Sequence, residues 1–93
     1  MSLTHRIALV TGAAGGIGSA VCRELAAQGA SVCLADLNTT ASLAAELRAA
    51  GHTVMEATAD VTSRTSISNA VSAVCEQWGR LDIVVNVAGT GSL

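Results

Sequence analysis

The sequence contains no tyrosine, lysine, phenylalanine or proline, and Trp78 is its only aromatic residue. Without a lysine, the chain cannot form the phosphate-binding loop of the P-loop nucleotidases. Charged residues make up only 13% of the chain and the net charge is -2, so there is no basic stripe of the kind that nucleic-acid binding requires. These absences predict that the chain does not bind nucleic acid.

Long apolar runs are also missing. No stretch approaches the roughly 18–20 apolar residues that cross a bilayer, and no signal-peptide core precedes the first apolar run. We therefore expect a protein without a membrane partner that resides in the cytoplasm, with an organelle matrix as the alternative.

Cysteine and histidine are few and scattered. Cys22, Cys33 and Cys75 form no C-x-x-C pair, and His5 and His52 lie far from any cysteine in the sequence. The pattern predicts reduced, half-buried thiols and no metal site.

Apolar runs alternate with helical patterns along the chain, and half of the residues are hydrophobic, at 51%. The length and composition predict one domain at most, and the alternation predicts an α/β fold over residues 1–93. Each helical pattern is followed by a glycine, which is typical of βαβ units around a parallel sheet. Strands are expected over 6–11, 31–36, 53–58 and 82–87; helices are expected over 16–28, from a cap at Asn38 or Thr39 to Ala50, and from a cap at Thr62 to Trp78.

Right-handed crossovers fix the expected order of the strands. The first two helices lie on one face while the chain steps outward, and the third crossover returns past the first strand, so the order is 3-2-1-4 with helices on both faces. Ligands of such sheets bind at the carboxyl ends of the strands, where the order reverses. The expected fold is a Rossmann-type sheet that stops after strand 4, whose free apolar edge could support self-association.

A glycine-rich turn, residues 11–18, joins the first strand to the first helix. A helix start presents unpaired N–H groups and a partial positive charge, which stabilise a pyrophosphate. Gly12 would allow the sharp turn, Gly16 the close approach of a ligand, and Gly18 the close contact of the helix with the sheet. Asp36 ends the next strand, where an acidic residue accompanies this turn in dinucleotide-binding folds. We therefore expect a dinucleotide site.

Four stretches resemble, in order and spacing, the motifs of the short-chain dehydrogenases/reductases. They are Thr11-Gly12-x-x-x-Gly16-x-Gly18, Ala35-Asp36-Leu37, Ala59-Asp60-Val61-Thr62 and Asn86-Val87-Ala88-Gly89, the last departing at Val87, where the family usually has a second Asn. The resemblance covers nearly the whole chain and implies that residues 1–93 form the N-terminal, dinucleotide-binding half of a Rossmann-fold domain. It implies these cofactor-binding residues: Gly12, Ala13, Ala14, Gly15, Gly16, Ile17, Gly18, Asp36, Asp60, Val61, Asn86, Ala88 and Gly89.

Asp36 determines the expected cofactor. A carboxylate there accepts hydrogen bonds from both ribose hydroxyls and repels a 2′-phosphate, so NAD(H) is expected and not NADP(H). Relatives that take the phosphate tend to carry a basic residue at the position of Gly15 or Leu37, and neither is basic here.

The resemblance assigns roles to the remaining positions. Asp60 and Val61 would contact the adenine, although Asp-x-Thr is also an ordinary start of a helix. Asn86 would brace neighbouring strands, and the small residues Ala88 and Gly89 would let the ribose and nicotinamide lie close.

The family's catalytic Ser, Tyr-x-x-x-Lys pair and later Asn have no counterpart in these 93 residues. The resemblance implies an oxidoreductase that, in full length, transfers hydride between a nicotinamide cofactor and an alcohol or ketone, whereas this chain alone is expected to be inactive. A non-catalytic truncated isoform or interaction module is the alternative. A methyltransferase-like fold is a third interpretation, against which the Thr11-Gly12 start argues.

Overall fold

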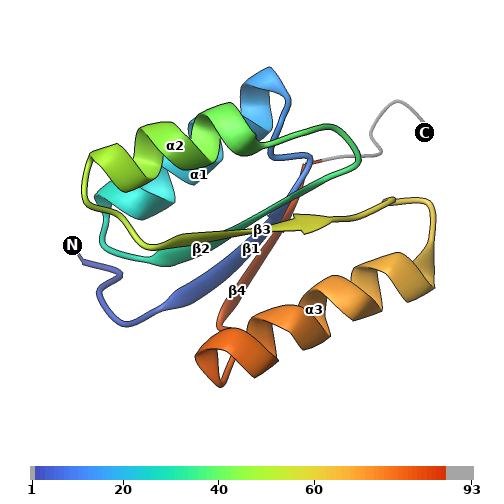
Figure 1. Cartoon of the computed structure of the whole chain (residues 1–93). Coiled ribbons are helices and arrows are strands. Elements are labelled where there is room, and N and C mark those ends of the chain that lie inside the picture. Colours follow the sequence, from blue (N-terminus) through green and yellow to red (C-terminus); the bar gives the residue numbers. More distant parts are fainter. Residues whose placement is uncertain (1, 88–93) are drawn as a thin grey trace.

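The computed structural model describes residues 2–87, which alternate between strands and helices (Figure 1). The predicted α/β class is confirmed, and element ends differ from the expected ones by a few residues. The elements are β1 (Ile7–Thr11), α1 (Gly16–Ala27), β2 (Ser31–Asp36), α2 (Ala41–Ala49), β3 (Val54–Thr58), α3 (Arg64–Trp78) and β4 (Ile83–Asn86).

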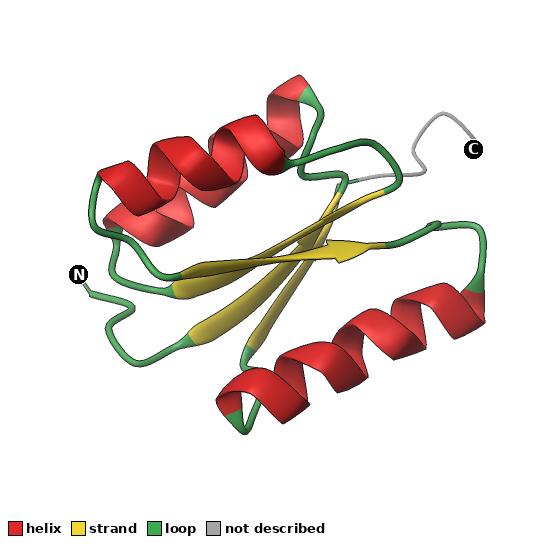
Figure 2. Ribbon diagram, in the orientation of Figure 1, coloured by secondary structure: helices red, strands yellow, loops and turns green. Residues whose placement is uncertain are grey.

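The four strands form one parallel sheet in the order β3-β2-β1-β4, as predicted. Helices α1 and α2 cover one face and α3 covers the other (Figures 1 and 2). None of the described helices is both long and apolar enough to cross a bilayer. The strand order reverses between β1 and β4. In such sheets, ligands bind in a crevice at the carboxyl ends of the two strands at this point.

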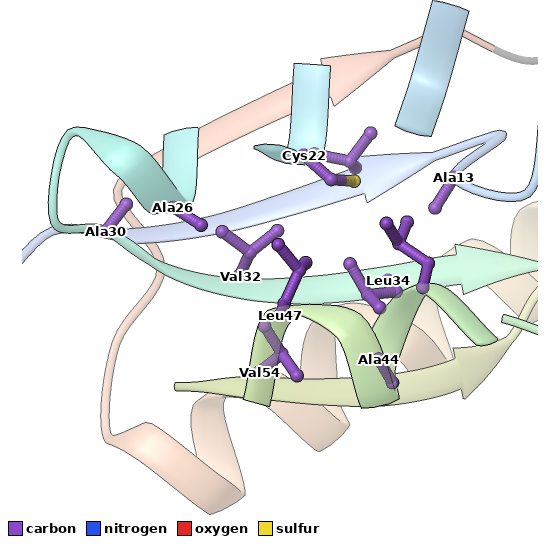
Figure 3. Packing of buried hydrophobic residues seen from close by; sticks show 11 residues of the cluster. Ala13, Cys22, Ala26, Ala30, Val32, Leu34, Ala44, Leu47 and Val54 are labelled. Atoms are coloured by element: carbon purple, nitrogen blue, oxygen red, sulfur yellow. The ribbon is translucent and has the colours of Figure 1, made fainter. Parts of the chain in front are cut away.

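Each face of the sheet has its own apolar core. Under α1 and α2, residues such as Cys22, Val32 and Leu34 are fully buried, and Leu47 packs beside them (Figure 3). Under α3, Leu9 and Val74 are fully buried. Burying one such leucine stabilises the fold by about 1.5–3 kcal/mol, so both layers hold the strand ends in place.

The cysteines divide by position. Cys22 and Cys33 are buried on opposite faces of the sheet, and Cys75 is exposed on α3. All three are free thiols, as predicted, but none is half-buried. Burial raises the pKa of Cys22 to about 11 and that of Cys33 to about 12.

Two helix caps differ from the predicted ones. The N-cap of α2 is Thr40, although the Thr39 hydroxyl does accept the Ala41 N–H at 3.2 Å. The N-cap of α3 is Ser63, whose hydroxyl oxygen accepts the Ser66 N–H at 3.1 Å. The predicted cap, Thr62, does not cap the helix, because its hydroxyl and its N–H both donate to Asp60 Oδ1, two residues earlier in the chain.

The apolar stripe of α1 also differs. Helical spacing in the sequence predicts that Ile17 shares an apolar stripe with Val21 and Leu25, but the Ile17 side chain is 73% exposed. The buried side of α1 consists of Gly18, Cys22 and Ala26. Gly18 packs directly on the preceding turn, which rotates Ile17 away from the sheet.

Strands β3 and β4 are the sheet edges within residues 2–87, as predicted. The register pairs Leu9 with Val84, so Val84 lies on the face that α3 covers. Because α3 contacts β1 and β3, Val84 remains 57% exposed.

A polar contact fixes the amino end of the sheet. The Ile7 N–H donates to Asp82 Oδ2 at 2.8 Å, and Arg80 Nε donates to the same oxygen at 3.0 Å. The hydrogen bond from Ile7, with a smaller effect of Arg80, lowers the pKa of Asp82.

Candidate dinucleotide site

The glycine turn has the geometry that its spacing predicts. Gly12 has a φ of 76°, a left-handed conformation that turns the chain sharply off β1. A Cβ on Gly18 would lie 1.9 Å from the Gly12 carbonyl oxygen, so a side chain there is excluded, whereas a Cβ on Gly16 would meet no atom within 4 Å. The close contact at Gly18 is therefore with the turn, and space lies open beside Gly16.

The start of α1 has unpaired backbone donors. Its N-cap, Gly15, has no side chain to accept them, and the first turn contains no acidic residue. Within residues 2–87, no acceptor contacts the N–H groups of Gly16, Ile17 or Gly18. These three groups, together with the helix dipole, are suited to an anion.

The amides of the preceding three residues are already used. Ala13 N–H donates to the Ala35 carbonyl at 3.1 Å, and Gly15 N–H to the Gly12 carbonyl at 3.2 Å. Ala14 N–H donates to Asp36 Oδ2 at 3.0 Å. Of the predicted cofactor-binding residues in this turn and helix start, those with an N–H group free of protein acceptors begin at Gly16.

Asp36 stands opposite this helix start, at the end of β2. Besides the Ala14 N–H, its carboxylate accepts the Asn38 N–H, on Oδ1 at 2.9 Å. Each carboxylate oxygen retains a further lone pair for a hydroxyl donor. The side chain is held in one orientation by two backbone groups.

A cavity of about 400 Å³ lies between these two features. The exposed Ile17 side chain forms part of its wall. Sequence reasoning did not identify Asn38 or Val87 as lining residues. The wall consists of Gly12, Ala14, Gly15, Gly16, Ile17, Gly18, Asp36, Asn38 and Val87.

The two residues of the predicted adenine pair have different surroundings in the structure. Val61 lines a smaller cavity of about 140 Å³ together with Asp36 and Leu37, but Asp60 does not line it. The Asp60 carboxylate accepts two hydrogen bonds from Thr62, which lower its pKa. An ordinary Asp-x-Thr helix start makes the same contacts, and the adenine role of Asp60 stays a prediction.

Asn86 links two strands. The Thr11 hydroxyl donates to Asn86 Oδ1 at 2.7 Å, which ties β1 to β4 beside the cavity. The bracing contact implied by the resemblance is thus present, and Thr11 is a partner that the sequence did not reveal. Ala88 and Gly89 lie outside the described residues.

A parallel sheet in the order 3-2-1-4, with a glycine turn and an acidic strand end at its point of reversal, is a Rossmann-type nucleotide-binding arrangement. The family model described as short chain dehydrogenase matches residues 6–93. The chain belongs to the short-chain dehydrogenase family.

Named relatives agree with this assignment. The chain is 42% identical over 92 residues to the 3-hydroxyacyl-CoA dehydrogenase type-2 of Drosophila melanogaster, covering 97% of this chain and 35% of the relative. It is 40% identical over 93 residues to the D-threitol dehydrogenase of Mycolicibacterium smegmatis, covering 98% and 36%. The crystal structure of a dehydrogenase/reductase from Sinorhizobium meliloti 1021 superposes with a TM-score of 0.90 at 36% identity, covering 95% and 36%. The chain therefore spans about a third of the length of these relatives.

Proposed function

We propose that this chain binds NAD(H) and forms the cofactor-binding half of an oxidoreductase that transfers hydride between a nicotinamide cofactor and an alcohol or ketone. One observation carries the proposal. The unpaired N–H groups of residues 16–18 and the Asp36 carboxylate line the same cavity of about 400 Å³.

The two walls of the cavity suit different parts of a dinucleotide. The helix start supplies donors and positive potential for a pyrophosphate. The open space beside Gly16 would let the phosphate oxygens approach the backbone. Asp36 would accept the hydroxyls of the adenosine ribose, and Val61 would lie beside the adenine. A bound cofactor supplies the hydride acceptor or donor at the nicotinamide ring.

The choice of NAD(H) over NADP(H) rests on charge. A 2′-phosphate on the ribose would place negative charge beside Asp36, and no arginine is among the residues that line the cavity. The other predicted site residues, including Ala13, Asp60, Ala88 and Gly89, stay part of the proposal.

The chemistry needs residues beyond these 93. The chain has neither tyrosine nor lysine, whereas the family uses a tyrosine as general acid and base and a lysine that lowers the pKa of this tyrosine. We therefore propose that the 93-residue chain holds the cofactor without turnover and that an alcohol or ketone substrate binds only in a longer product.

Calorimetric titration with NADH tests the proposal. Asp36→Ala should weaken binding by about 1–3 kcal/mol, because ribose hydroxyls would lose a buried acceptor. The control is Glu76→Ala, which removes an exposed carboxylate on α3, across the sheet from the cavity. An unchanged affinity in Asp36→Ala would remove Asp36 from the site, and tighter binding of S-adenosylmethionine than of NADH would favour a methyltransferase-like function.

A second candidate function is an interaction module, and the exposed Val84 on the edge strand β4 favours it. An apolar strand edge pairs with other chains, and a charge placed on it prevents this. If the chain self-associates through β4, Val84→Lys should shift the 93-residue chain to monomer in size-exclusion chromatography with light scattering. Leu37→Lys, at a residue 63% exposed and away from β4, is the control. Equal oligomer in wild type and Val84→Lys would exclude association through this strand.

A further inference from the structure

A second cavity, of about 340 Å³, adjoins the proposed cofactor site. It shares Asp36 and Asn38 with the first cavity and extends from them to β3. Glu56 and Thr58 form its β3 wall. A group attached to a ribose at Asp36 and directed away from the helix start would therefore project toward β3.

The register of β2 and β3 places two carboxylates on this cavity. Leu34 pairs with Glu56, and Asp36 pairs with Thr58, so Glu56 and Asp36 lie on the same face of the sheet, two residues apart along neighbouring strands. Strand spacing and rise put their Cα atoms about 8 Å apart.

The Glu56 side chain is held in place by two partners. The Thr40 hydroxyl donates to Oε1 at 2.8 Å, and Thr40 itself is only 6% exposed. Arg48 Nη1 lies 3.7 Å from Oε2, and Arg48 Nη2 also donates to the Val54 carbonyl at 3.2 Å, on the amino side of Glu56. Arg48 is not among the residues that line the cavity, which presents Glu56 and Asp36.

We infer that Glu56 is a second determinant of cofactor selectivity, which together with Asp36 disfavours a phosphate on the adenosine ribose. The inference rests on the proposed function, because it concerns the same cofactor at the same site. Selectivity for the unphosphorylated ribose would then come from two strands, with Asp36 in contact with the sugar and Glu56 acting through its charge across the cavity.

The size of the effect follows from Coulomb's law. A phosphate that carries about two negative charges, roughly 8 Å from one carboxylate in water, is bound about 5-fold more weakly than without that carboxylate. Because the Debye length is about 8–10 Å at physiological salt, the effect shrinks as salt is added. NADH has no charge at this position, so its affinity should not respond.

The test uses the complete product of the reading frame that contains these residues. Dissociation constants for NADH and NADPH are measured by calorimetry at low salt for wild type and Glu56→Gln. The glutamine keeps an oxygen for the Thr40 hydroxyl and removes the charge. Glu46→Gln is the matched control, because Glu46 is likewise paired with an arginine, Arg23 at 2.7 Å, but lines neither cavity.

In Glu56→Gln, NADPH should bind about 5-fold more tightly while NADH binding stays unchanged, and added salt should reduce the difference from wild type. Glu46→Gln should change neither constant. An unchanged NADPH to NADH ratio in Glu56→Gln, or an equal change in the control, overturns the inference while leaving NAD(H) binding intact. Failure of the wild type to bind either dinucleotide overturns the proposed function and the inference with it.

Discussion

Gly18→Ala should destabilise the fold by placing a methyl group inside the backbone of the glycine turn. The added Cβ would lie 1.9 Å from the Gly12 carbonyl oxygen, 2.6 Å from its carbonyl carbon and 3.1 Å from Ala13 Cα. All three neighbours are backbone atoms, so no side chain can rotate to make room. Relief requires α1 and the turn to move apart by roughly 1 Å in a close-packed region.

The cost follows from this displacement. Overpacking a core usually costs about 1–3 kcal/mol, and a clash with backbone belongs at the upper end, near 3 kcal/mol. For a domain of this size, 3 kcal/mol lowers the melting temperature by roughly 12–24 °C. It is also a large share of the total stability, since native domains are stable by about 5–15 kcal/mol.

Urea denaturation followed by circular dichroism measures the change, with Gly16→Ala as the matched control. A Cβ at Gly16 meets nothing within 4 Å, so this variant should keep wild-type stability or gain a few tenths of a kcal/mol from the helix propensity of alanine. The same variant should lose dinucleotide affinity, because the methyl group would occupy the space expected for the phosphate. If Gly18→Ala matched Gly16→Ala in stability to within about 0.5 kcal/mol, the packing argument would be wrong.

Asp82→Asn should lower stability at neutral pH and lose its effect in acid. The Ile7 hydrogen bond lowers the folded-state pKa of Asp82, so the stability that Asp82 contributes is complete above the unfolded-state pKa and disappears as the pH falls through the folded-state pKa. Urea midpoints of both proteins at several pH values test this. A difference in midpoint that persists in strong acid would contradict it. Thiol labelling should modify Cys75 first, because burial raises the pKa of Cys22 to about 11 and that of Cys33 to about 12. Mass spectrometry of peptides after a short pulse with iodoacetamide checks the order of labelling. Equal labelling of all three thiols would contradict the burial of Cys22 and Cys33.

Much of the fold could be predicted because its signals are local. Continuous apolar runs such as 7–10 indicate strands buried on both faces, and a glycine after each helix marks its end; Gly29, Gly51 and Gly79 all have positive φ values. The handedness of crossovers then fixes the strand order. Helix starts were less predictable, because a run such as Thr62-Ser63 offers two possible caps. Thr62 donates to Asp60, two residues before it, and Ser63 is left as the cap.

The parts of the candidate site that could be predicted are those where the backbone geometry requires glycine. Gly12 serves the turn because its φ is positive, and Gly18 because a Cβ there would clash with backbone atoms. The position of Ile17 could not be read from helical periodicity, since the contact of Gly18 with the turn rotates the helix. The contribution of Glu56 depends on strand register, which periodicity does not specify.

The hydrogen bond from Ala14 N–H to Asp36 has a consequence for cofactor engineering. A designer who wishes to fit the proposed NAD(H) site to NADP(H) would replace this acidic residue first. Here that exchange would also release the glycine turn from the end of β2, so a loss of activity would not show that the new pocket is wrong. Asparagine, which can still accept the amide while carrying no charge, is the better first step, with larger changes added only once the turn has kept its shape.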